Sequence, residues 1–244
     1  FLYFIGFAPS SLHFKPPMHK QHAEGSPLTV SNLTPEAVLR EEASLRALAH
    51  NTWDEGVKVL HDVVNEHFGE AAPASNQARV ERLMALYQTI YHAATQDNFV
   101  ADQLHRKLRD WLDDRLADKV TQPLVALRDS VEKLSSTVIQ LAKSFLEFTR
   151  FGTVGFMSVN NSMATRHVSI KTMFNQAFVN AVNNAKEDAL GSAIRSQVHA
   201  HRDGCSVDLS ALNAAIVIFI DVDDATPVGG KSVIEVYIKE AVMH

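Results

Sequence analysis

The sequence predicts an all-α protein, and three observations indicate this class. Apolar residues recur at helical spacings of three and four from about residue 34 to about residue 220. Glycine, proline and small polar residues gather between these segments, at 69–76, 151–167 and 201–204. The 244-residue chain is 46% hydrophobic and 21% charged, so it has enough apolar side chains to bury a sizeable core.

The composition excludes several classes of function. A net charge of −5 is not that of a polycation that binds nucleic acid. The single cysteine, Cys205, excludes a disulfide framework and a cysteine-based zinc site, and it fits a reducing compartment such as the cytoplasm or nucleus. No run reaches the roughly 18 apolar residues that a membrane span needs. The apolar opening FLYFIGFA is short and follows no cationic region, so no signal peptide is expected.

The first helix is expected to begin after an irregular tail. Residues 1–33 hold four prolines and no sustained apolar period. In the sequence LTPEAV, Thr34 is placed to cap a helix and Pro35 suits its first turn. Leu33 is placed to pack against Val38 across the helix start.

Three apolar stripes then predict three helices that each bury one face. The 69–76 segment, GEAAPASN, separates the first stripe from the second as a linker. In order, the stripes are Trp53, Val57, Leu60 and Val64; Val80, Leu83, Tyr87, Ile90 and Ala94; and Leu104, Leu108, Trp111, Leu112 and Leu116.

The most regular pattern predicts one long helix that opens at Pro123. Its apolar seam is too short for a free-standing coiled coil, so the helix is expected to pack in a bundle. The seam consists of Leu124, Leu127, Val131, Leu134, Val138, Leu141, Phe145 and Phe148. The glycine-bearing stretch 151–167 is expected to interrupt the helical pattern after it.

The last part of the pattern predicts a further long helix, a turn and one more helix. The long helix carries Phe174, Phe178, Val182, Leu190, Ile194 and Val198 on one side. The sequence HRDG at 201–204 predicts a turn, and Asp208 is placed to cap the next helix, which begins LSALNAAIVIFI. Its AAIVIFI run is also compatible with a buried strand, because period alone does not separate the two.

The segment ERLMALYQTIYHAAT, residues 81–95, has more large apolar side chains than one helix face needs. Leu83, Tyr87 and Ile90 share one stripe, which we expect in the core. Met84 and Tyr91 are seven residues apart, nearly two turns, and form a neighbouring stripe that we expect to face outward. Tyrosine combines a large apolar ring with a polar tip, which suits a protein interface.

Candidate catalytic and metal motifs are weak. ATPVGGKS, with Lys231, resembles a phosphate-binding loop, but Ala225 replaces its first glycine and Pro227 removes a backbone donor. An NTPase therefore stays a minor alternative. His199 and His201 are two residues apart and face different sides of a helix, so they do not predict a metal site. No cofactor or metal is expected.

Taken in order, these segments resemble the N-terminal region of the cullin family. TWDEGVKVLHDVV is similar to the family's first helix, and RLMALYQTIYHAAT resembles its second. LHRKLRDWLDDRLADKV and STVIQLAKSFLEFTRF are similar to later helices, and the stretch from AIRSQVHAHRDGCS to IVIFIDV is the best late match. The resemblance covers about residues 52–244. The chain departs from the family in RDSVEKLSS, which lacks the usual aromatics, and at Phe178, where tryptophan is usual.

The resemblance implies an elongated rod of stacked helical repeats, the non-catalytic scaffold of a ubiquitin ligase. The implied organisation is a tail at 1–33, a first repeat at 34–150 and a second at 151–244. It also implies an adaptor partner of the Skp1 or BTB type, bound through the second and fifth helices. The matching positions are Leu83, Met84, Tyr87 and Tyr91, with Leu127, Val131 and Leu134 on the fifth-helix side. A helical subunit of another assembly, such as a vesicle-tethering rod, is the alternative.

Overall fold

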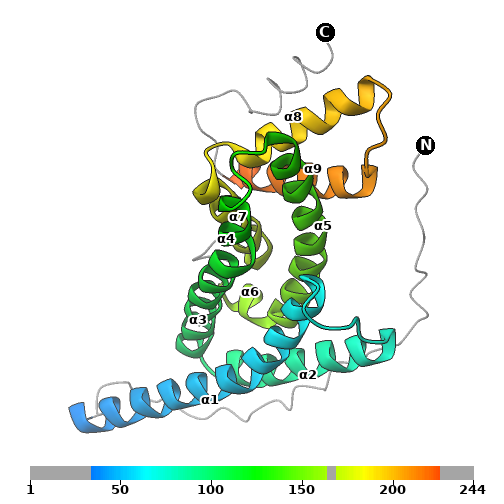
Figure 1. Cartoon of the computed structure of the whole chain (residues 1–244). Coiled ribbons are helices and arrows are strands. Elements are labelled where there is room, and N and C mark those ends of the chain that lie inside the picture. The colour runs from blue at the N-terminus through cyan, green and yellow to red at the C-terminus, as the bar shows by residue number, and fades with distance from the viewer. Residues whose placement is uncertain (1–33, 164–168, 226–244) are drawn as a thin grey trace. The chain divides into compact units, whose positions relative to one another are not determined.

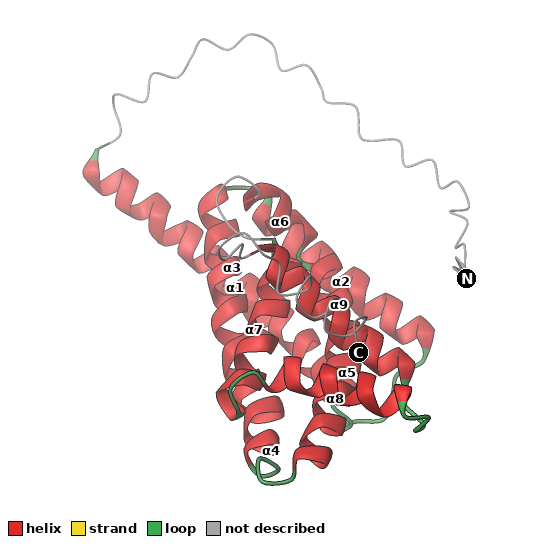
Figure 2. Cartoon of the chain, turned by 90° about the horizontal axis from the view of Figure 1, so that it is seen from above, coloured by secondary structure: helices red, strands yellow, loops and turns green. Residues whose placement is uncertain are grey.

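The computed structural model describes residues 34–163 and 169–225, and every regular element in those ranges is a helix (Figures 1 and 2). The predicted all-α class is therefore confirmed. The chain divides into two compact units, Phe1–Leu39 and Arg40–His244, and the arrangement described below is that of the second unit. The 1–33 tail and the segment that holds Lys231 lie outside the described residues.

The helices follow one another through short connections. In chain order they are α1 (Pro35–His67), α2 (Asn76–Ala94), α3 (Asn98–Leu116), the π-helix η2 (Ala117–Thr121), α4 (Gln122–Val125), α5 (Val131–Gly155), α6 (Met157–Met163), α7 (Ile170–Ala185), α8 (Ala189–Arg202) and α9 (Leu209–Ala225). The apolar run near residue 218 lies in α9, so the helical alternative for AAIVIFI is correct.

The predicted helix boundaries at 34, 69–76, 201–204 and 208 are confirmed. The Thr34 hydroxyl accepts a hydrogen bond from the Ala37 backbone N–H at 3.3 Å. The Asp208 carboxylate accepts one from the Ala211 N–H at 3.0 Å. Gly204 has φ of 81°, a conformation that other residues rarely adopt, and it ends the turn after α8.

The predicted long helix from Pro123 is wrong because the chain turns at residues 126–130. The four-residue α4 ends at Val125, and Ser130 adopts an extended backbone before α5 begins. The turn contains no glycine or proline, and its last two residues are Asp129 and Ser130. The seam is consequently buried only in part: Leu124 and most of its later members are buried, whereas Val131 is 62% exposed.

The predicted single helix that carries Phe174 and Val198 is also wrong. The chain breaks at residues 186–188 into α7 and α8. Asp188 has φ of 50°, a left-handed conformation that aspartate tolerates better than most residues. Its carboxylate accepts a hydrogen bond from Arg195 at 2.6 Å, which ties the break to the first turns of α8.

The glycine-bearing stretch 151–167 was expected to interrupt the helix, but its first part continues α5. A side chain on Gly152 would overlap the ring of Phe174, and one on Gly155 would overlap Leu86. These two glycines therefore serve the close approach of α5 to α7 and to α2. The interruption comes only at Phe156, and α6 follows at once.

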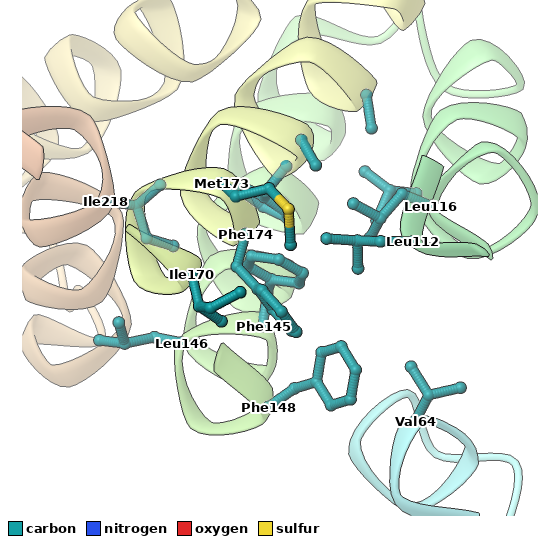
Figure 3. Close-up of a cluster of buried hydrophobic side chains, with 14 of the residues drawn as sticks. Val64, Leu112, Leu116, Phe145, Leu146, Phe148, Ile170, Met173, Phe174 and Ile218 are labelled. Atoms are coloured by element: carbon teal, nitrogen blue, oxygen red, sulfur yellow. The ribbon is translucent and has the colours of Figure 1, made fainter. Parts of the chain in front are cut away.

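The core is rich in phenylalanine and centres on α5 and α7 (Figure 3). Phe145 stacks on Phe178 with ring centroids 4.6 Å apart, and Phe148 lies 5.4 Å from Phe174. Leu112 of α3 belongs to the same cluster of buried side chains. Residues before and after position 150 thus share one core. The division into repeats at 34–150 and 151–244, and their stacking into a rod, stay predictions.

Candidate functional site: the outer face of α2

Polar caps fix both ends of α2. The Ser75 hydroxyl accepts a hydrogen bond from the Ala78 N–H at 3.2 Å at the first turn. At the other end the Thr95 hydroxyl donates to the carbonyl of Tyr91 at 2.8 Å. Between these caps, Gln77 and Glu81 pair at 2.9 Å on the exposed side, one turn apart. The helix is therefore well defined along the segment that carries both tyrosines.

One side of α2 is buried and another carries exposed apolar residues. The buried side consists of Leu86, Ile90, Ala93 and Ala94. Val80 is 59% exposed, Met84 47% and Tyr91 43%, and Tyr87 is half-buried beside them. Spacings of four, three and four place these four residues on one side of the helix. We call Val80, Met84, Tyr87 and Tyr91 the outer stripe.

The two tyrosines of the outer stripe contact each other. Their ring centroids are 5.7 Å apart and the ring planes are inclined by 27°. The His92 ring lies against Tyr91 in a T-shaped arrangement, with ring centroids 5.9 Å apart. Stacking restricts the rotamers of both tyrosines, so the stripe presents a preformed aromatic surface.

The structure corrects the expected core face of this helix. Leu83, Tyr87 and Ile90 were expected in the core, but only Ile90 is buried there, and Leu86 is the main buried residue beside it. Leu83 and Tyr87 lie half-buried at the edge. The prediction that Met84 and Tyr91 face outward is confirmed. The buried face is rotated because Leu86, not Tyr87, points at the neighbouring helices.

An acidic side chain of α1 helps to hold α2 in place. The carboxylate of Glu66 accepts hydrogen bonds from Arg82 and from the Ala74 N–H, and Arg79 lies 3.9 Å away. Burial alone would raise the pKa of Glu66, but these hydrogen bonds and the two arginine charges lower it overall. Glu66 therefore stays ionised and links the end of α1 to the start of α2.

The other predicted partner-binding residues lie far from the outer stripe. Leu127 is half-buried, Val131 is exposed and Leu134 is only 4% exposed, so Leu134 offers little surface here. Leu127 lies in the turn before α5, and Val131 and Leu134 lie in the first turn of α5, at the end near α8 and α9, whereas Gly155 at the other end meets α2 (Figure 1). From Leu134 to Gly155 α5 extends about 30 Å, at ~1.5 Å per residue. The structure does not bring the two groups together.

Among the described residues, no three His, Cys, Asp or Glu side chains gather into a set that would hold a metal ion. Cys205 is exposed in the turn after α8. His61 instead makes a structural contact between α1 and α3. Its Nε2 lies 3.4 Å from the indole N–H of Trp111 and 3.3 Å from the guanidinium of Arg115. None of the helices within 34–163 and 169–225 has the length and apolar character to cross a membrane.

A family model described as the cullin alpha solenoid domain matches residues 57–241. The chain belongs to the cullin family. This cullin match confirms the resemblance seen in the order of the segments, and it begins in the middle of α1 and includes all of α2. The chain is accordingly a cullin-type helical scaffold domain. Neither the curated proteins nor the solved structures gave a match to this cullin sequence.

Proposed function

We propose that this chain is a non-catalytic scaffold of a cullin-RING-type ubiquitin ligase and that the outer stripe of α2 binds an adaptor of the Skp1 or BTB type. The observation that carries the proposal is the exposed aromatic stripe on the second helix of a cullin-family chain. Such a role would place the chain in the cytoplasm or nucleus.

The chemistry of the outer stripe supports a protein partner. Tyrosine is enriched among the residues that dominate interface energies, and methionine adapts to irregular apolar surfaces. Because Tyr87 and Tyr91 already stack on each other, ordering them on binding costs less side-chain entropy than ordering two free rings. Exposed polar residues beside the stripe, Glu81 and Gln88, suit the polar rim that surrounds an apolar interface centre.

The geometry favours α2 alone as the main contact. Val131 is exposed, but it lies at the far end of α5. An interface of standard size buries about 800 Å² on each partner. A compact adaptor contact centred on Tyr91 would therefore not extend to Val131, and a partner that also contacts Val131 would need a longer footprint.

Affinity purification of the full chain from cells tests the proposal. We expect the wild-type chain to recover an adaptor of the Skp1 or BTB type, and the Met84→Ser/Tyr91→Ser variant to lose it. Val131→Ser is the control, because it changes an apolar residue outside the stripe that is even more exposed than Met84 and Tyr91. Circular dichroism checks that all three chains are equally helical. Recovery of membrane-traffic subunits in place of an adaptor would support the tethering alternative and contradict the proposal.

A further inference from the structure

On the side of α2 away from the outer stripe, the Leu86 side chain is fully buried. A Cβ added to Gly56 of α1 would lie 3.3 Å from one methyl carbon of Leu86, Cδ1. A Cβ added to Gly155 of α5 would lie only 2.5 Å from the other methyl carbon, Cδ2, and 3.0 Å from Cγ. The Leu86 side chain thus fits between two glycines of two different helices.

The conformation of these glycines does not explain their presence. Only Gly69 and Gly204 have a positive φ among the glycines of the described residues, and Gly56 and Gly155 lie within helices. Glycine destabilises a helix relative to alanine, so a helical glycine without a contact to explain it is unfavourable. The close approach of Leu86 explains glycine at 155, where an added Cβ would lie 2.5 Å from Cδ2, and favours it at 56, where an added Cβ would lie 3.3 Å from Cδ1.

Leu86 has little room to respond to a side chain at residue 155. The added Cβ would lie close not only to the methyl Cδ2 but also, at 3.0 Å, to Cγ, which is nearer the backbone of α2, and the Leu86 side chain is fully buried. Ile90, one turn further on, closes the same side with its own methyl 3.4 Å from the added Cβ at Gly56. We therefore expect a larger residue at 155 to shift α2 together with the Leu86 side chain. Tyr87 and Tyr91 belong to that rigid helix and would move with it.

We propose that Gly56 and Gly155 are positioning residues that fix the place of α2 in the fold and thereby the presentation of its outer stripe. Neither glycine needs to touch a partner. The expected effect of these glycines on adaptor binding rests on the proposed function, but their effect on the position of α2 does not. The position of α2 and the affinity for an adaptor are therefore measured separately.

The first measurement is the distance between α2 and α5 in the full chain without a partner. Spin labels are attached at Gln88→Cys and Arg150→Cys, both exposed positions, in a Cys205→Ser background. In Gly155→Ala the added Cβ would lie 2.5 Å from Cδ2 of Leu86, and the two atoms must separate to an ordinary contact of about 3.5 Å. The mean distance between the labels should therefore change by about 1 Å or more. An unchanged distance would overturn the inference.

Two further variants separate positioning from loss of stability. Gly152→Ala lies one turn away on α5 and would overlap Phe174 of α7, so it strains the core without touching Leu86. It should leave the label distance unchanged. Combining Gly155→Ala with Leu86→Val adds one carbon and removes one, a volume-conserving exchange. The double variant should restore the wild-type distance, and its failure to do so would contradict a role through Leu86.

The second measurement is the affinity for a purified adaptor that the wild-type chain binds. Gly155→Ala should weaken binding by about tenfold, the scale of one important contact, and Leu86→Val should restore it in the double variant. Equal affinity of the wild type and Gly155→Ala, despite a changed label distance, would overturn the link to binding. If the wild type binds no adaptor, the proposed function fails, and the label distances still decide whether the glycines position α2.

Discussion

Tyr87 and Tyr91 stack on each other along one side of α2, with ring centroids 5.7 Å apart. Tyr91 is 43% exposed, and Met84 beside it is 47% exposed. Large apolar side chains that gather on one exposed helix face are a common mark of a protein interface. In a chain that belongs to the cullin family, this pair is the feature of the described residues that best fits a partner-binding role.

Two exposed valines distinguish the outer stripe from the far end of α5. Val80 is 59% exposed on the stripe, and Val131 is 62% exposed at the other end of α5, about 36 Å along that helix from Gly155. Val80→Gln should weaken adaptor binding by about tenfold, because it places an unpaired polar group in the interface. Val131→Gln should leave the affinity unchanged, as measured by calorimetric titration. A larger effect at Val131 would instead support the fifth-helix contact that the sequence suggested.

Asp208 is expected to make stability depend on pH in the acid range. Hydrogen bonds from the Ala211 N–H, Lys143 and Gln140 lower its pKa from 3.8 to about 2. A carboxyl group whose pKa is lower in the folded state stabilises the fold above its unfolded pKa, and this contribution is lost as pH falls toward the folded value.

The measurement compares the urea midpoints of the wild type and Asp208→Asn between pH 5 and pH 2. The wild type should be more stable near pH 5, and the difference should shrink below about pH 4, the unfolded pKa of aspartate. Asp203→Asn, in the exposed turn after α8, is the control and should show no such convergence. A constant difference across the range would contradict this role of Asp208.

His61 is expected to make stability depend on pH nearer neutrality. Burial and the charge of Arg115 lower its pKa from 6.5, although Asp62 acts in the opposite direction. Its Nε2 faces the N–H groups of Trp111 and Arg115, so only the neutral ring can accept from them. The stabilisation is therefore present above about pH 6.5 and is lost as pH falls through the lower folded pKa.

His61→Gln tests this contact because an amide oxygen can accept from Trp111 but does not titrate. The variant should lose less stability than the wild type between pH 7.5 and pH 5, as followed by thermal unfolding. If the wild type and His61→Gln lose equal stability over this pH range, protonation of His61 does not break the contact with Trp111 and Arg115.

Local signals in the sequence predicted much of the fold. Thr34 and Asp208 cap helices as expected, because a capping side chain needs only backbone groups two or three residues away. The turns at 126–130 and 186–188 were missed because neither contains glycine or proline. Aspartate tolerates the left-handed conformation of Asp188, but the residue type alone does not predict it.

The candidate site was predicted in part. The periodic pattern placed Met84 and Tyr91 outward, which is correct. It placed Tyr87 in the core, because the choice between Leu86 and Tyr87 depends on Gly56 and Gly155, which approach from other helices. The separation of Val131 from α2 likewise depends on which end of α5 meets α2, and no local pattern records such a long-range contact.

The most direct measurement is the affinity of the purified full chain for a panel of purified Skp1-type and BTB-type adaptors. We expect the wild type to bind at least one member with a dissociation constant in the micromolar range or below. Tyr91→Ala should weaken that binding by about 30-fold, the scale of an interface hot spot, while helicity stays unchanged. Absence of binding across the panel, or equal affinity of the wild type and Tyr91→Ala, would contradict the adaptor-binding role of α2.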